Sequence, residues 1–332
     1  MSLIKKIIAA VPLSLLLATL SVMASSIEEG KEALQNENYT FALEQFQLLA
    51  EKGDAEAQLF LGGMYLRGEG VDQNLEEAAE WLKLAAEQGE PTAQNNLGWM
   101  YQNGRGVSRD FQEAMKWYRR SAEQGMAVAQ QNIAQMYYDG EGVSRDYSEA
   151  ASWFELAAEQ GLTKSQETLG DMYYRGMGVD QSHEKGVQWT RRAAEQGASV
   201  AQYNLGVAYS EGLGVPQSYT DAAAWYLLAA EQGDSEAQFN LGNMYYQGRG
   251  VEQNMVESTK WYQLAAEQDE PEAQYFVGVA YAEGIGVTQD SLEAVKWFFQ
   301  AAENGIDEAK EELEKLSEQN LAEAKEALEE LN

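Results

Sequence analysis

Residues 93–125, AQNNLGWMYQNGRGVSRDFQEAMKWYRRSAEQG, contain a pattern that recurs along this chain of 332 residues. Tryptophan marks the pattern most clearly, because it returns every 36 residues at positions 81, 117, 153, 189, 225, 261 and 297. Gly-x-Gly-Val keeps the same register at 68–71, 104–107, 140–143, 176–179, 212–215, 248–251 and 284–287. A fixed period of this length predicts a stack of repeats, each burying the same side chains against its neighbours.

Each repeat is predicted to form two helices. In the first repeat, small or apolar residues at 57, 61, 64 and 65 share one helix face. That helix should end at Gly68, because glycine adopts the left-handed C-cap conformation without a Cβ clash. The second helix should end at Gly89 and begin after an N-cap at Asn74, whose equivalents are Asp110, Asp146, Ser182, Ser218, Asn254 and Asp290. Most repeats place Glu three residues after this N-cap, which is the spacing of a capping box.

The repeat resembles the Sel1-like repeat (SLR), a relative of the tetratricopeptide repeat (TPR). The matching string is Ala-Gln-x-x-Leu-Gly-x-Met-Tyr-x-x-Gly-x-Gly-Val, followed by Ala-x-x-Trp-x-x-x-Ala-Ala-Glu-Gln-Gly, and seven copies span residues 54–305. The resemblance implies an all-α fold, a right-handed α/α superhelical solenoid of helix–loop–helix repeats. It also implies that the first helices line a concave groove.

The two ends of the array differ from the repeats. Residues 25–53 are similar to a shorter TPR-like helix pair that lacks the Gly-x-Gly-Val loop. Residues 306–332 are predicted to form capping helices, which would cover the last apolar face with leucines at 313, 316, 321, 328 and 331. A coiled-coil dimer is the alternative for this segment, but a break at 317–320 leaves few heptads, and we expect a monomer.

Residues 1–24 have the three parts of a secretory signal peptide. Lys5 and Lys6 precede an apolar run at 7–20, and Val22-Met23-Ala24 offers small residues for cleavage. The run is short for a spanning helix, and no cysteine follows it that could carry a lipoprotein anchor. We therefore predict a periplasmic or secreted bacterial protein without stable membrane insertion after signal cleavage.

The charge of the chain limits its partners. The sequence has 54 acidic and 23 basic residues, a net charge of −31, and removing Lys5 and Lys6 with the signal takes this to −33. Such a surface repels phosphate backbones, so nucleic acid is not an expected ligand. Basic peptides or proteins are favoured as partners, although solubility alone would also explain the charge.

The residue inventory argues against catalysis. The chain has no cysteine and one histidine, His183, so zinc sites of nitrogen and sulfur ligands and Cys–His pairs are not available. Ser182 and Lys185 form a Ser-x-x-Lys string of the penicillin-binding type, but Ser182 falls at a predicted N-cap. We expect no catalytic residue, no metal and no cofactor. A β-lactamase-like hydrolase is the third functional alternative, because some SLR proteins are described as β-lactamases.

Candidate ligand-binding residues are those that change from repeat to repeat on the first helix. TPR groove positions correspond to 56, 59, 63 and 66 and their successors at intervals of 36 residues. Rings and amides there could bind an extended peptide, or they could serve helix packing. The candidates are Trp99, Asn96, Asn132, Tyr138, Tyr174, Tyr203, Asn204, Phe239, Asn240, Tyr246 and Tyr275. We predict a non-enzymatic protein- or peptide-binding scaffold, with cell-wall glycan or peptidoglycan fragments as the alternative ligand.

Three features depart from the regular pattern or are unexpected in it. Residues 162–196 form the least regular repeat, where Gly186 and Thr190 predict a weak joint because glycine inside a helix costs about 1 kcal/mol relative to alanine. Asp269 replaces the glycine after a second helix, so we expect a different turn there. Glu87 and its six equivalents oppose the helix dipole, and we expect each to bind amides of the following helix.

Overall fold

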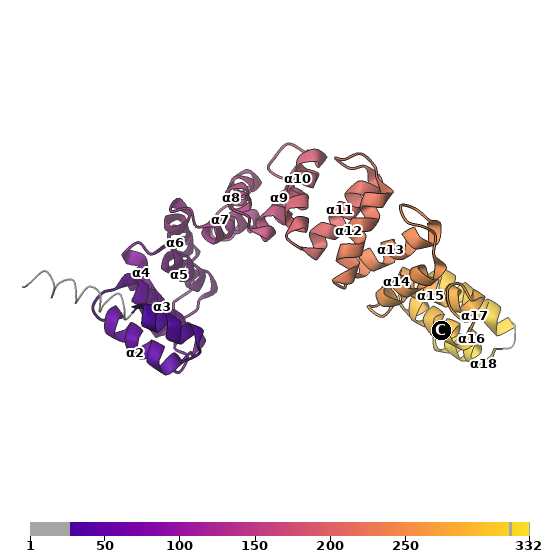
Figure 1. The fold of residues 1–332 in the computed structure, drawn as a ribbon, viewed down its shortest axis with the longest axis horizontal. Helices are drawn as coiled ribbons and strands as arrows, with labels where there is room; N and C mark the ends of the chain where they lie inside the picture. Colours follow the sequence, from indigo (N-terminus) through magenta and orange to yellow (C-terminus); the bar gives the residue numbers. More distant parts are fainter. Residues whose placement is uncertain (1–26, 319–320, 332) are drawn as a thin grey trace, which may run out of the picture. The chain divides into compact units, whose positions relative to one another are not determined.

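The computed structural model describes residues 27–318 and 321–331, so the predicted signal peptide lies outside the described residues. Within these ranges the chain forms helices joined by turns and no strands, which confirms the predicted all-α repeat fold (Figure 1). The chain divides into two compact units, unit 1 (Met1–Leu162) and unit 2 (Thr163–Asn332). Helical residues 27–35 are the first described element of unit 1.

First and second helices alternate along both units. In unit 1, α2 (Tyr39–Ala50) precedes three pairs, which are α3 (Ala55–Arg67) with α4 (Leu75–Glu87), α5 (Pro91–Asn103) with α6 (Phe111–Glu123), and α7 (Ala127–Asp139) with α8 (Tyr147–Glu159). Unit 2 has four pairs, which are α9 (Thr163–Arg175) with α10 (His183–Glu195), α11 (Ser199–Glu211) with α12 (Tyr219–Glu231), α13 (Ser235–Gln247) with α14 (Met255–Ala266), and α15 (Pro271–Glu283) with α16 (Ser291–Glu303).

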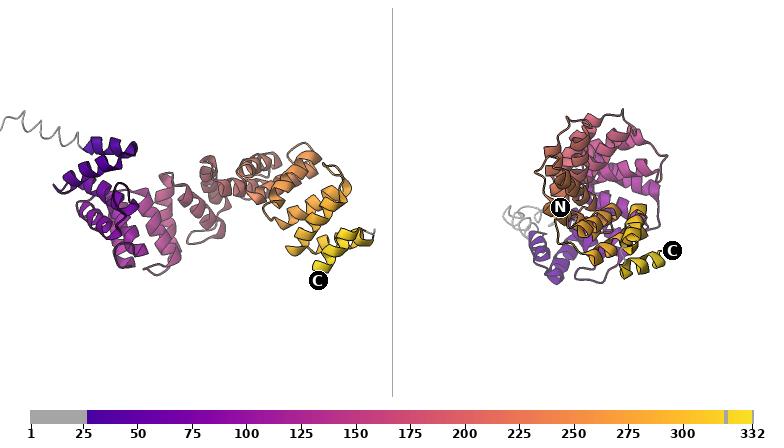
Figure 2. Two further views of the ribbon diagram at one scale, coloured as in Figure 1. Left: turned by 90° about the horizontal axis from the view of Figure 1, so that it is seen from below. Right: turned by 90° about the vertical axis from the view of Figure 1, so that its right-hand side faces the viewer.

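Two further helices follow α16 at the C-terminal end of unit 2, coloured yellow in Figure 2. They are α17 (Asp307–Glu318) and α18 (Ala322–Glu330). Leu313 of α17 and Ala324 of α18 are fully buried in one cluster with Phe298 of α16. The other leucines of the segment pack against this cluster, so α17 and α18 cover the apolar face of the last repeat. No helix among the described residues has the length and apolar character needed to cross a membrane.

The turn between the two helices of a repeat depends on a glycine and a capping side chain. Gly68 ends α3 in the left-handed conformation (φ 75°, ψ 36°). Asn74 accepts a hydrogen bond from the Glu77 N–H at 3.2 Å, and the equivalent residue caps the second helix in all seven repeats, as predicted. The second bond of a capping box is replaced, because the Asn74 N–H donates to the carbonyl of Tyr65 at 3.0 Å.

The second glycine of each loop lets one repeat rest on the preceding one. Gly214 has φ 72°, and a Cβ there would collide with the backbone carbonyl of His183 at the start of α10. Gly250 meets Tyr219 at the start of α12 in the same way. Within each unit, the loop of a repeat therefore lies on the first turn of the second helix before it in that unit, a distance that only glycine allows.

Within a repeat, the two helices approach closely where a side chain of the second helix lies over a glycine of the first. A Cβ at Gly98 would be 2.7 Å from the ring of Tyr118, and one at Gly206 would be 2.6 Å from the ring of Tyr226. We call the buried residues of the second helix at this position the packing row: Leu82, Tyr118, Phe154, Thr190, Tyr226, Tyr262 and Phe298. Thr190 is the one small side chain in it.

Successive repeats are joined by a buried chain of side-chain amides, here called the glutamine relay. Gln58 Nε2 donates to the carbonyl of Ala50, at the end of the preceding helix, at 3.1 Å. Gln58 Oε1 accepts from Gln88 Nε2, at the end of the following helix, at 2.8 Å. The same relay recurs as Gln124–Gln94–Ala86, Gln160–Gln130–Ala122, Gln232–Gln202–Ala194, Gln268–Gln238–Ala230 and Asn304–Gln274–Ala266. Three helices are thus held by one side chain.

The structure corrects the prediction that Glu87 binds amides of the following helix. Glu87 directly precedes Gln88 of the relay. Glu87 is exposed and makes no hydrogen bond to the following helix. The N–H of Thr92 in the first turn of α5 is instead bound by the side chain of Glu90, at 3.3 Å. The inter-repeat hydrogen bond is instead made by Gln58 and its equivalents, whose Nε2 donates to the end of the preceding second helix, because an amide supplies the donor that a carboxylate lacks.

The turn at Asp269 is also less different than expected. The Asp269 N–H donates to Ala266 at 3.1 Å and the Glu270 N–H donates to Ala265 at 3.2 Å, which is the pattern found at Gly89 and Glu90. Asp269 adopts φ 62°, whereas Gly89 has φ 97°. The prediction of a different turn is wrong for the hydrogen bonds, because aspartate tolerates the left-handed region better than most side chains.

The relay makes a first testable prediction. Gln202→Leu should lower the free energy of unfolding by about 1–3 kcal/mol, because the buried Ala194 carbonyl and the Gln232 amide each lose a partner. Urea unfolding followed by circular dichroism measures this loss. The matched control is Glu231→Ala, which changes an exposed neighbour of the relay and should shift stability by less than about 0.5 kcal/mol. Equal losses in the two variants would contradict the assignment.

Candidate ligand-binding face of the first helices

Three hollows occupy the same place in three consecutive repeats of unit 2. Each is lined by two successive first helices, by the second helix between them and by the following loop. Hollow 1 lies between α9 and α11, hollow 2 between α11 and α13, and hollow 3 between α13 and α15, with volumes of about 220, 290 and 120 Å³. Equivalent residues line them, because Tyr174, Ser210 and Tyr246 are 36 residues apart.

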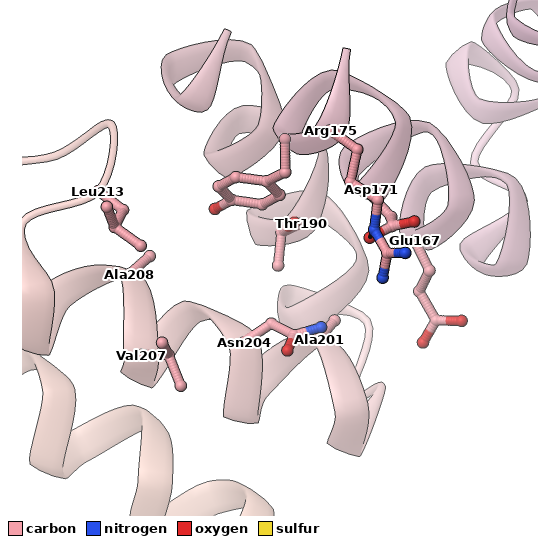
Figure 3. Close-up of a pocket in the computed structure, with 10 residues that line it drawn as sticks. Glu167, Asp171, Arg175, Thr190, Ala201, Asn204, Val207, Ala208 and Leu213 are labelled. Atoms are coloured by element: carbon pink, nitrogen blue, oxygen red, sulfur yellow. Dashed lines mark hydrogen bonds and ion pairs between the residues drawn. The ribbon is translucent and has the colours of Figure 1, made fainter. Parts of the chain in front are cut away.

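Hollow 1 combines an apolar side with a charged one. Figure 3 shows Val207, Ala208 and Leu213 on one side and Glu167, Asp171 and Arg175 on the other, with Thr190 between them. Arg175 Nε donates to Asp171 Oδ1 at 2.7 Å. The charged pair is at the rim, where both side chains are largely exposed.

Tyr174 has an unusual position in hollow 1. Its ring lies against Gly186, where an added Cβ would be 3.0 Å from three ring atoms. The ring centroid is 5.7 Å from that of His183. Its hydroxyl is buried next to Thr190. Burial raises the pKa of Tyr174 to about 12, and the interaction with the Thr190 side chain opposes this rise.

Hollow 2 is polar. The guanidinium of Arg249 lies 5.6 Å from the centroid of the Tyr219 ring. Asn240 Nδ2 donates to the Glu236 carbonyl at 2.9 Å, and Asn243 Oδ1 accepts from the Tyr262 hydroxyl at 2.8 Å. The hollow therefore offers amide groups and one cation.

Hollow 3 is aromatic. The rings of Tyr262 and Phe276 are stacked with their centroids 5.2 Å apart, and Tyr275 meets Phe276 edge-on at 5.5 Å. Tyr246 completes the lining and is 41% exposed. The three hollows thus share a position and differ in chemistry.

The sequence-predicted candidates of unit 2 fall into two groups. Five of them line hollows, namely Tyr174 and Asn204 in hollow 1, Asn240 in hollow 2, and Tyr246 and Tyr275 in hollow 3. The other two are engaged in packing, because Tyr203 lies 5.9 Å from Tyr226 and Phe239 lies 5.7 Å from Tyr262, between ring centroids.

In unit 1, three of the four candidates contact other side chains of the chain. Asn132 Nδ2 donates to Asn95 Oδ1 at 2.9 Å, and Asn95 Nδ2 donates to Asn96 Oδ1 at 3.4 Å, so a residue outside the candidate set joins these two. Tyr138 meets the Tyr147 ring edge-on at 5.2 Å. Trp99 is the most exposed of the four at 38%, and the Arg105 guanidinium lies 5.8 Å from its ring centroid.

Sequence reasoning missed the residue that most shapes hollow 1. Thr190 was interpreted as part of a weak joint, whereas the structure places it in the lining of a hollow. The signal was present, because Thr190 departs from the packing row. Asn243 of hollow 2 lies in the predicted groove row that begins at residue 63, but it was not among the candidates, and Arg249 lies in a loop outside those rows.

Carboxylates crowd the N-terminal ends of α13 and α15. Burial, followed by a hydrogen bond to Glu272 and the charge of Glu236, raises the pKa of Glu270. Burial also raises the pKa of Asp234, and burial together with a hydrogen bond to Glu236 raises the pKa of Tyr203. The cluster is under electrostatic strain that a cationic partner would relieve.

The Ser-x-x-Lys string has a structural role. Ser182 Oγ accepts a hydrogen bond from the Lys185 N–H at 3.3 Å, which confirms the predicted N-cap of α10. The Lys185 ammonium lies 5.1 Å from the centroid of the Tyr173 ring. The two groups therefore serve the helix start and an aromatic contact.

Comparison with known proteins shows that the chain belongs to the Sel1-repeat family. The Sel1 repeat model matches residues 55–90, 91–126, 127–162, 164–197, 199–234, 235–270 and 271–306. Proteins built from this repeat are generally non-catalytic scaffolds that mediate protein interactions. Among curated proteins, no match was found.

Two solved structures are similar over most of the chain. One is c5321, a protective antigen of uropathogenic Escherichia coli with an SLR fold, which is 36% identical with a TM-score of 0.88, covering 97% of this chain and 71% of that one. The other is a Sel1 repeat protein from Oxalobacter formigenes, which is 33% identical with a TM-score of 0.65, covering 90% of each chain.

The strained carboxylates make a pH-dependent prediction. The folded pKa of Glu270 is raised, so the folded state binds this proton more tightly than the unfolded state, and stability rises as the pH falls through the raised value. Glu270→Gln should therefore raise the thermal midpoint at neutral pH. The gain should disappear once the pH is below the ordinary glutamate value of 4.5.

Thermal unfolding followed by circular dichroism across this pH range provides the measurement. Glu252→Gln is the control, because it removes the same charge from an exposed position in unit 2. A gain at neutral pH that is no larger for Glu270→Gln than for the control would show that net charge alone is responsible.

Proposed function

We propose that this protein is a scaffold that binds an extended segment of a partner protein along the first helices of unit 2. The observation that carries this proposal is the row of three equivalent hollows, one for each step from repeat to repeat, with apolar, polar and aromatic linings. A single small-molecule ligand would need one site. A regular row of different sites suits a chain that presents successive side chains.

The spacing of the hollows supports an extended peptide. Neighbouring first helices meet through their side chains, as where the ring centroids of Phe239 in α13 and Phe276 in α15 lie 6.1 Å apart. Helices in such contact lie roughly 8–10 Å apart, and an extended chain advances about 3.3–3.6 Å per residue. Successive hollows would therefore accept side chains about three residues apart.

Charge supports a basic partner. Residues 163–332 include 30 acidic and 11 basic side chains. The crowded carboxylates Asp234, Glu236, Glu270 and Glu272 lie at the N-terminal ends of α13 and α15, whose side chains line hollows 2 and 3. Opposite charge would accelerate encounter with a basic segment and make the association sensitive to salt.

The ring arrangement favours a peptide over a glycan. Sugar binding by aromatic rows requires open ring faces, and of the aromatic candidates Trp99 and Tyr246 are the exposed ones, at 38% and 41%. Tyr203, Phe239 and Tyr275 present their rings to neighbouring rings.

We also propose an envelope or secreted location. The sequence features of residues 1–24 support export, and the similarity to a protein described as a protective antigen supports exposure outside the cytoplasm.

Peptide binding tests the proposed function. The full chain is screened against a phage-displayed library of random linear peptides, and recovered sequences are measured as synthetic peptides by fluorescence polarisation. We expect selection of Lys- and Arg-containing peptides whose affinity falls as salt rises. The variant Asn204→Ala with Tyr246→Ala should bind about tenfold more weakly, because it removes a side chain from hollow 1 and another from hollow 3.

The matched control removes apolar side chains from the second helices. Leu228→Ala with Leu264→Ala changes exposed residues of α12 and α14 that line none of the three hollows, so binding should be unchanged. Co-sedimentation with insoluble peptidoglycan provides the competing arm. Retention on peptidoglycan together with no enrichment of any peptide would overturn the proposal in favour of a glycan ligand.

A further inference from the structure

We infer that hollow 1 is a pocket for one aromatic side chain of the bound peptide, flanked in the peptide by a lysine or arginine. The inference rests on the proposed function and specifies the ligand of one hollow. Four observations carry it: the short side chain at Thr190, the glycine kept at Gly170, the position of Tyr174, and the charges at the rim.

The first observation is the composition of the packing row. Five of its seven members are aromatic and one is leucine, whereas Thr190 has a short branched side chain. The packing row has a large side chain in all the other repeats. At Thr190 the volume of that side chain is missing. Protein interiors are close-packed, and an absence of this size leaves a space unless neighbours collapse into it.

The second observation is that the seat for a ring is retained. In other repeats, Gly98, Gly206, Gly242 and Gly278 lie directly under the ring of the packing row, with an added Cβ 2.6–2.7 Å from it. Gly170 keeps this glycine, although the residue above it is Thr190. Thr190 Oγ1 lies at this place, 2.8 Å from where a Cβ of Gly170 would be, so the glycine that elsewhere lies under a ring here lies under a short side chain.

The third observation is that Tyr174 only partly fills the space. Its ring turns toward α10 and rests on Gly186, where the other repeats have alanine or serine. This leaves hollow 1 at about 220 Å³ with Ala201, Val207, Ala208 and Leu213 as apolar lining. The Tyr174 hydroxyl is buried and lies next to the Thr190 side chain.

The fourth observation concerns the charge next to the hollow. Glu167 pairs with Lys164 at 3.3 Å, and the Lys164 side chain is 73% exposed. Exposed pairs of this kind are weak and exchange readily. Asp171 at the rim is likewise paired with Arg175, so a cation of the ligand would compete with Lys164 and Arg175 for these two carboxylates. The excess of acidic residues in 163–332, 30 against 11 basic, favours its approach.

The experiment fills hollow 1 with a side chain of the protein itself. Thr190→Phe restores the ring that the row has elsewhere, and Gly186→Ala with Thr190→Phe gives this repeat the residues Ala150 and Phe154 of α8. Peptides from the random library are bound to the full chain, and affinity and thermal midpoint are measured for each variant. We expect the selected peptides to contain an aromatic residue next to Lys or Arg, and both variants to bind about thirtyfold more weakly.

The thermal midpoint separates a filled pocket from a misfolded repeat. The double variant should unfold at the wild-type temperature or above it, because a ring in this place packs on Gly170 and alanine favours the helix. Leu228→Phe, which adds a ring at an exposed position of α12, should leave both binding and the midpoint unchanged. Replacing the aromatic residue of the peptide by alanine should weaken wild-type binding and have little further effect in the Thr190→Phe variant.

The outcomes distinguish the two proposals. Selected peptides that lack an aromatic residue, or that bind the well-folded double variant as tightly as the wild type, would overturn the assignment of hollow 1 and leave the peptide-binding scaffold intact. Failure to select any peptide on the wild-type chain would overturn both.

Discussion

The hydrogen bonds of one buried amide hold the array together. Gln58 and its equivalents are between 1% and 5% exposed, so a donor or acceptor left unpaired there would carry the full cost of desolvation. The side chain donates to the end of the preceding second helix and accepts from the end of its own second helix, and both bonds require one relative placement of three helices. Glutamine suits this role because it is donor and acceptor at once, whereas glutamate at neutral pH has no proton to donate. The loop glycines add a second constraint between neighbours, since Gly214 and its equivalents bring the loop of one repeat onto the helix start of the previous one.

Features that depend on local interactions were predictable from the sequence. The helices, the glycine C-caps and the N-caps such as Asn74 follow from residues three or four positions apart, and the structure confirms them. Features that depend on how the helices pack against one another were not. Both glutamine rows are visible in the sequence, but Gln88 and Gln58 are 30 positions apart and their bond requires the helix pair to be folded. The inter-repeat role was assigned to Glu87, next to Gln88, because a carboxylate at the C-terminal end of a helix is unfavourable with the helix dipole and needs another reason to be there. The prediction for the turn at Asp269 was wrong because the backbone there keeps the same hydrogen bonds and changes only φ.

The candidate site was predictable as a face and not as a set of pockets. Residues that vary at the 36-residue period mark the first helices, and Tyr174, Asn204, Asn240, Tyr246 and Tyr275 do line hollows. Other variable residues on the same helices, such as Tyr203 and Asn132, fill the contacts between neighbours. Variation between repeats at the surface of a helix therefore does not distinguish candidate ligand-binding residues from residues that pack against other helices. Hollow 1 differs from the others at a scaffold position, because Thr190 stands in its lining where hollows 2 and 3 have Tyr226 and Tyr262.

Each relay joins a repeat only to the repeat before it, and this affects how such a protein can evolve. Every bond in the relay is preserved when a block of 36 residues is duplicated or removed, since each repeat meets its new neighbour through the same amides and the same loop glycine. A deletion of any other length places a different side chain against the end of the preceding helix. Unequal recombination between copies of the gene segment can therefore add or remove whole repeats, and each resulting protein keeps the contacts between its repeats. Each added module would also add a potential hollow, so under the proposed function the length of the segment that the protein could bind would grow with its number of repeats.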